Sequence, residues 1–178
     1  MGLHERMTSL FEITDFKSLQ NWSVAHIIDS IFEYNHNYKL RKVGDFLKRN
    51  KTVVNVQDTE IYKRVTIRLY NKGVHLRNTE VGSKIGTKRQ FLVRKGQFLL
   101  SKIDARNGAF GIATEEVNNA IITPDFFAYD INVKEIIPEF LVLLTTTQQF
   151  QKFSQSASTG TTGRQRIDEQ KFLNVKVP

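Results

Sequence analysis

Arg64-Val65-Thr66-Ile67-Arg68-Leu69-Tyr70 and, directly after it, Asn71-Lys72-Gly73 decide the fold of this chain. In the first segment valine, isoleucine and leucine alternate with polar residues, which is the period of a β-strand with one buried face. The second segment is a turn signal, because asparagine and glycine adopt the backbone angles that tight turns require. Val74–Arg77 is expected to return antiparallel. The stretch therefore predicts a β-hairpin that lies with one face on an apolar core.

Short strand-like segments separated by turns continue after this hairpin. The turn signals are Lys95-Gly96, Asn107-Gly108 and Pro124. The strands between them are expected at Phe91–Val93, Phe98–Ile103, Phe110–Ala113, Ala120–Thr123 and Phe126–Ile131. Many short strands with closely spaced turns are typical of antiparallel sheets. We therefore expect an α+β fold with a twisted, mostly antiparallel sheet or partial barrel flanked by helices.

Helices are expected on both sides of the strand region. An apolar stripe at helical spacing predicts a helix from about Phe16 to His36. A short helix is expected at Leu40–Lys48 and a long one at Ile136–Phe153. Pro138 falls in the first turn of the long helix, where proline is tolerated.

Length and composition indicate an ordinary globular protein. The chain has 178 residues, of which 40% are hydrophobic and 25% charged. We divide it into an N-terminal segment and helix, residues 1–38, and a main domain, residues 39–178. It has no cysteine, which excludes disulfides and thiolate zinc sites. Its apolar runs are too short to cross a bilayer and no secretion signal is recognisable, so we expect no membrane partner and a cytoplasmic location.

Positive charge is concentrated in the middle of the chain. Between Lys63 and Arg106 twelve cations face two acids, a net charge of +10, and the remaining residues carry −2 of the chain's total of +8. A cationic region on a near-neutral body is typical of a surface that binds a polyanion such as DNA. A lysine-rich surface that only favours solubility remains the alternative.

Two groups of candidate DNA-contacting residues lie on or between the expected strands. Arg64, Arg68 and Lys72 belong to the hairpin, where strand periodicity places the two arginines on the side opposite the core. The loop Gly82–Arg89 supplies a second group, Lys84, Lys88 and Arg89. Both groups are also what an ordinary exposed hairpin would show.

Two more candidate groups follow later in the chain. Ser101–Gly108 supplies Lys102, Arg106 and Asn107, and arginine and asparagine are the side chains that pair with guanine and adenine in the major groove. The segment Ser158–Arg166 is rich in hydroxyls and glycine, which suits contact with phosphates. Its candidates are Thr161, Arg164 and Gln165. The first segment is alternatively a plain turn, and the second a helix end with a linker.

The sequence contains one weak candidate for an enzyme site. Dinucleotide, nucleophile-elbow and zinc-protease motifs are absent from the sequence. Pro124-Asp125 together with Glu169-Gln170-Lys171 could hold magnesium in a metal-dependent nuclease. We therefore expect a protein that is not itself an enzyme and that carries no cofactor.

Several segments resemble the target recognition domains of type I restriction–modification specificity subunits. The resemblance covers roughly Leu40–Pro178 and rests on the order and spacing of its segments. These segments are Arg94–Lys102 with Ile103–Ile112, Ile136–Leu141 with Phe150–Phe153, and Gly160–Ile167 with Phe172–Pro178.

This resemblance implies sequence-specific recognition of one half of a split site in double-stranded DNA. In that family, partner methyltransferase subunits modify adenine and a separate restriction subunit cuts, so the recognition domain is not catalytic. Only one such domain is present, and the chain stops where the family's spacer helix would begin. We therefore expect an excised piece or a half-subunit. The rival hypothesis is a protein-interaction module that docks a partner through the apolar face containing Trp22.

Overall fold

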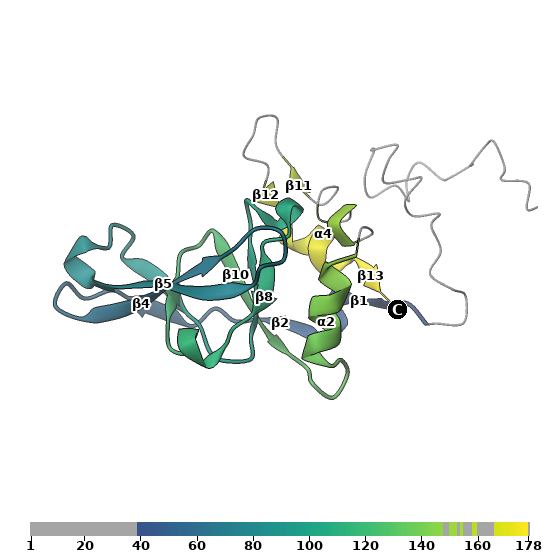
Figure 1. Cartoon of the computed structure of the whole chain (residues 1–178), viewed down its shortest axis with the longest axis horizontal. Coiled ribbons are helices and arrows are strands. Elements are labelled where there is room, and N and C mark those ends of the chain that lie inside the picture. The colour runs from purple at the N-terminus through teal and green to yellow at the C-terminus, as the bar shows by residue number, and fades with distance from the viewer. Residues whose placement is uncertain (1–38, 148–149, 153, 155–157, 160–165, 178) are drawn as a thin grey trace, which may run out of the picture.

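The computed structural model describes residues 39–147, 150–152, 154, 158–159 and 166–177 (Figure 1). The helix predicted at Phe16–His36, with the Trp22 face, lies outside the described residues. So do three of the candidate site residues: Thr161, Arg164 and Gln165. No helix within the described ranges has the length and apolar character needed to cross a membrane.

The predicted hairpin is the longest part of a five-stranded sheet. β4 (Ile61–Ile67) and β5 (Val74–Val81) pair antiparallel around the predicted turn. The sheet has the order β3-β6-β9-β4-β5, and its other strands are β3 (Val53–Asn55), β6 (Arg89–Leu92) and β9 (Ile121–Ile122). All its pairs are antiparallel except β4 with β9. The hairpin is thus confirmed, with β5 longer than predicted.

A second sheet of four strands has the order β2-β10-β7-β8, and all its pairs are antiparallel. Its strands are β2 (Leu47–Arg49), β10 (Phe126–Ile131), β7 (Phe98–Ser101) and β8 (Phe110–Ile112). Two short pairs complete the strands: β1 (Arg41–Lys42) with β13 (Lys176–Val177), and β11 (Ser158–Thr159) with β12 (Arg166–Ile167). The strands therefore form two main sheets where one was predicted.

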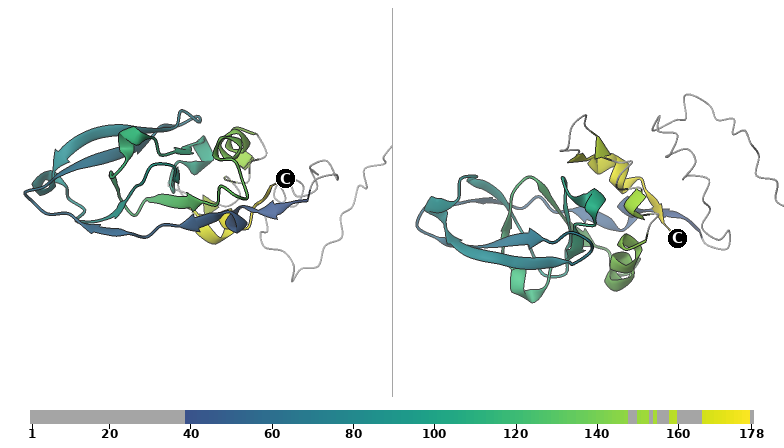
Figure 2. Two further views of the ribbon diagram at one scale, coloured as in Figure 1. Left: turned by 90° about the horizontal axis from the view of Figure 1, so that it is seen from below. Right: turned by 45° about the horizontal axis from the view of Figure 1, so that its top comes forward.

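The described helices are short and lie at one end of the molecule, away from the outer end of the β4–β5 hairpin (Figures 1 and 2). They are α2 (Pro138–Thr145) and α4 (Glu169–Leu173). Four single 3-10 turns join strands: η2 (Val43–Asp45), η3 (Gly82–Lys84), η4 (Ala105–Asn107) and η5 (Glu115–Val117). Pro138 is the first residue of α2, as predicted.

The helix predicted at Leu40–Lys48 is wrong. That segment forms β1, η2 and the start of β2, which pair with β13 and β10. Its apolar residues Val43, Phe46 and Leu47 are buried all the same. Leu40, the fourth apolar residue of the predicted helix, is 42% exposed. Pairing with distant strands supplies the backbone hydrogen bonds that a helix would have made internally.

The single helix predicted at Ile136–Phe153 is also wrong in its extent. It ends at Thr145, and Phe150 lies in a separate helical turn. The hydroxyls of Thr145, Thr146 and Thr147 each donate a hydrogen bond of 2.7 Å to the carbonyl three residues earlier. The hydroxyl of Thr147 also accepts from the Phe150 N–H at 3.2 Å. Three consecutive threonines therefore compete with the helical hydrogen bonds and end α2.

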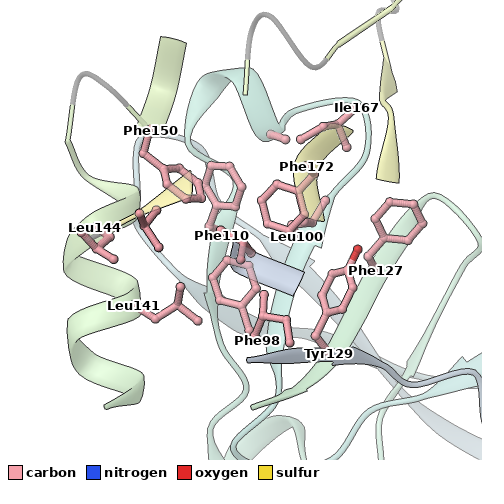
Figure 3. Packing of buried hydrophobic residues seen from close by; sticks show 14 of the residues in the cluster. Phe98, Leu100, Phe110, Phe127, Tyr129, Leu141, Leu144, Phe150, Ile167 and Phe172 are labelled. Atoms are coloured by element: carbon pink, nitrogen blue, oxygen red, sulfur yellow. The ribbon is translucent and has the colours of Figure 1, made fainter. Parts of the chain in front are cut away.

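Two apolar clusters lie on opposite sides of β7. Leu99 belongs to one cluster, with Val65 and Ile67 of β4, and its neighbours Phe98 and Leu100 belong to the other. The second cluster is rich in aromatic rings, which gather beside α2 in Figure 3: Phe98, Phe110, Phe127, Tyr129, Phe150 and Phe172. Successive side chains of β7 thus point into different clusters, so β7 packs against both sheets.

Candidate nucleic-acid-binding surface

The turn between β4 and β5 lies against the turn formed by η4. The N–H of Tyr70 donates to the carbonyl of Asn107 at 2.7 Å, and the N–H of Asn71 donates to the carbonyl of Gly108 at 2.8 Å. Two segments far apart in the sequence are therefore joined by backbone hydrogen bonds. They bring the predicted residues Arg68 and Lys72 to the same place as Arg106 and Asn107.

Glycines permit this close approach. Gly108 has a φ of +73°, and a Cβ atom on it would lie 2.9 Å from Oδ1 of Asn71. A Cβ atom on Gly111 would lie 3.0 Å from Cα of Gly73. Only a residue without a side chain fits where the two backbones meet. The sequence pattern had marked Asn107-Gly108 as a turn, and the contact with the hairpin explains the demand for glycine.

β12 brings a third segment to these turns. The N–H of Ile167 donates to the carbonyl of Lys102, and the N–H of Lys102 donates to the carbonyl of Asp125, both at 2.8 Å. The side chain of Arg166 forms an ion pair of 3.0 Å with Asp125. We call the assembled group the turn cluster: Arg68, Lys72, Lys102, Arg106, Asn107 and Arg166.

Lys102 occupies a partly buried position within the turn cluster. Its ammonium lies 4.4 Å from the centre of the Phe127 ring, within the range of a cation–π interaction. Burial, and next the positive charge of Arg49, lowers the pKa of Lys102 below its usual value. A cation held by a ring rather than by a carboxylate keeps its hydrogen-bond donors available for an anion.

Arg49 is a member of this region that the sequence analysis missed. Its guanidinium lies 4.0 Å from the centre of the Phe127 ring, and its Nε lies 3.7 Å from a carboxylate oxygen of Glu169. Burial lowers its pKa. Its neighbours are more than 70 residues away in the sequence, so no local pattern could have indicated its position.

The carboxylates of the nuclease hypothesis both have cationic partners. Asp125 pairs with Arg166, and Glu169 faces Arg49 and accepts a hydrogen bond of 3.3 Å from the Tyr129 hydroxyl. Burial, and next the charge of Glu169, raises the pKa of Tyr129 well above its usual value. Within the described part of the chain, no three acidic or histidine side chains gather where they could hold a metal ion.

The remaining predicted residues lie elsewhere on the five-stranded sheet. Lys84 ends η3, which follows β5, at the opposite end of the hairpin from the turn cluster (Figure 1). Lys88 pairs with Asp58 at 2.6 Å and donates to the carbonyl of Gly82 at 2.7 Å, so it holds the loop together. Arg89 lies 5.4 Å from the ring of Phe91, and Arg64 lies in the middle of β4. The structure thus separates the candidates into two groups, with Arg64 on the strand between them.

We call the second group the η3 group: Lys84, Lys88 and Arg89. It lies at the outer end of the hairpin, and Gly82 there allows the backbone to pass the 56–60 segment, because a Cβ atom on it would lie 1.9 Å from the carbonyl oxygen of Gln57. The two groups are connected by β4 and β5.

Comparison with known proteins gives one sequence relative and one similar fold. No protein-family model matches the chain. The chain is 28% identical over 114 residues, 62% of its length, to the type I restriction enzyme HindI specificity subunit of Haemophilus influenzae, and the match spans 24% of that protein. The crystal structure of the HsdS subunit from Thermoanaerobacter tengcongensis has a similar fold, with a TM-score of 0.63 and 12% identity. The similarity covers 84% of this chain and 40% of that one.

The chain therefore spans less than half the length of either protein. The resemblance to a target recognition domain of a type I specificity subunit, predicted from the sequence, is confirmed by the two comparisons. The predicted α+β class with mostly antiparallel strands is confirmed by the structure and by the similar fold.

Proposed function

We propose that this chain is the part of a type I specificity subunit that recognises one half of a split site in double-stranded DNA. One observation carries the proposal: the turn cluster gathers cations and an asparagine from three separate segments onto one end of the β4–β5 hairpin. Solubility alone does not require cations from three segments to lie close together. The relative that the chain resembles is itself a specificity subunit.

The side chains of the turn cluster have the chemistry that reading DNA requires. Lysines such as Lys72 neutralise phosphates, which gives affinity without sequence preference. Arg106 and Asn107 belong to a rigid turn whose first residue, Ala105, is fully buried. From such a turn, arginine can pair with guanine and asparagine with adenine along the edges of the bases. Thr161, Arg164 and Gln165, which follow β11 in the sequence, stay predicted DNA contacts.

The proposed domain contributes no catalytic step. It directs adenine methyltransferase and restriction subunits, which supply the chemistry, to the site that it has bound. This assignment predicts that a specificity subunit containing this domain copurifies with the methyltransferase subunit of its system. It also predicts that the chain neither methylates nor nicks plasmid DNA when it is incubated alone with S-adenosylmethionine or magnesium.

Selection of randomised duplex DNA at low salt tests the proposal directly. We expect a short motif to be enriched in the bound pool. Asn107→Ala is expected to relax one position of that motif, because it removes a base contact. Lys72→Ala is the matched control, and it is expected to weaken binding to all sequences equally. Retention without any enriched motif would reduce the surface to a non-specific one and overturn the proposal.

A further inference from the structure

We propose that Tyr70, at the tip of the β4–β5 turn, packs its ring against a base step of the bound duplex. The inference rests on the proposed DNA-binding function and adds an aromatic contact to the charged and polar ones. From the sequence pattern, Tyr70 is expected only as the end of a strand. The structure assigns it a different place: β4 ends at Ile67, and Tyr70 belongs to the turn.

The side chain of Tyr70 is largely exposed. Its relative exposure is 73%, whereas Tyr129 is fully buried and the Tyr62 hydroxyl is engaged with Glu60 at 2.6 Å. No described residue makes a hydrogen bond with the Tyr70 hydroxyl or a ring contact with its side chain. The exposed ring therefore offers an aromatic face to a ligand.

The backbone of Tyr70 lies in a conformation that tyrosine rarely adopts. Its φ is +59°, and Asn71 follows with a φ of +57°. Asparagine or glycine would adopt these angles at lower cost, while a bulky residue there is a true outlier. The hydrogen bonds to Asn107 and Gly108 hold the turn in this shape. A strained, over-determined backbone that presents an exposed side chain is a feature of functional sites.

The surroundings of Tyr70 indicate the chemical class of its ligand. Exposed Arg68 and Lys72 flank it by two residues on either side, and η4 with Arg106 and Asn107 lies against the same turn. An aromatic ring surrounded by cations matches a nucleic acid, whose bases stack on rings while its phosphates meet the charges. In duplex DNA such a ring acts as a wedge that partly unstacks a base step.

The test compares Tyr70→Asn and Tyr70→Phe with a control on β4. Ile61→Asn is the matched control, because Ile61 is 74% exposed and lies at the other end of β4. On the selected duplex we expect Tyr70→Asn to raise Kd about tenfold or more. Its Tm should stay equal or rise, because asparagine tolerates the backbone. Tyr70→Phe and Ile61→Asn should bind within about twofold of the unchanged chain.

A second readout detects the contact itself. With 2-aminopurine placed at successive positions of the selected duplex, the unchanged chain is expected to alter the fluorescence at one step, and Tyr70→Asn is expected to abolish that change. Wild-type affinity and an unchanged fluorescence profile for Tyr70→Asn would overturn the Tyr70 contact alone. Absence of an enriched motif for the unchanged chain would overturn the proposed function, and the Tyr70 contact with it.

Discussion

Phe127 shows how one side chain can organise charges around it. The cationic groups of Arg49 and Lys102 lie 4.0 and 4.4 Å from the centre of the Phe127 ring, within the range of cation–π interactions. The ring itself belongs to the aromatic core. Glu169 is the acidic partner of Arg49. The ring therefore connects the core of the four-stranded sheet with the turn cluster.

Arg49→Ala is predicted to destabilise the fold. It removes the contact with Phe127 and leaves Glu169, whose side chain is 26% exposed, without its nearest cation. We expect a loss of about 2 kcal/mol in the free energy of unfolding. Arg89→Ala is the control, since Arg89 also lies over a ring but is exposed, and it should change stability by about 0.5 kcal/mol or less. Urea denaturation measures both, and equal effects would contradict the role given to Arg49.

The packing of the hairpin turn on η4 is the element-scale feature on which the turn cluster depends. Gly108→Ala is predicted to disturb it, because the φ of Gly108 is +73° and the new Cβ atom would lie 2.9 Å from Asn71. We expect a loss of about 2 kcal/mol in unfolding free energy. Gly86→Ala, where a Cβ atom meets open space, should be neutral or stabilising. Thermal unfolding measures both variants, and an equal Tm for the two would contradict the role given to Gly108.

The same turn shows what sequence patterns can and cannot predict. Alternation predicted β4, and apolar segments between turn signals predicted β7 and β10, because these signals are local. In the segment Leu40–Lys48, Val43, Phe46 and Leu47 are buried as their spacing predicted, but the conformation was wrong, since its strand partners lie far along the chain.

Some residues of the candidate site could be predicted from the sequence and others could not. Lys72, Lys102, Arg106 and Asn107 were identified from residue type and turn context, and the structure places them together. Arg49 was missed because its contacts are distant in sequence. Tyr70 was missed because a positive φ at tyrosine leaves no trace in a pattern of residue types.

At the scale of the whole molecule, the turn cluster and the η3 group mark the two ends of one hairpin. The strand between them, β4, has seven residues, which corresponds to about 20 Å or roughly six base pairs of duplex. One duplex can contact both groups only if it lies along the hairpin. Arg64, in the middle of β4, would then lie between the two contacts.

The dependence of Kd on salt tests this orientation with two double variants. Arg68→Ala with Lys72→Ala removes exposed cations at one end, and Lys84→Ala with Arg89→Ala removes them at the other. On a long duplex, each lost phosphate contact should lower the slope of log Kd against log salt by about 0.9. On a duplex trimmed to the selected motif, the first pair should keep its effect and the second should lose it. A second pair that acts equally on both duplexes would show that the DNA does not follow the hairpin.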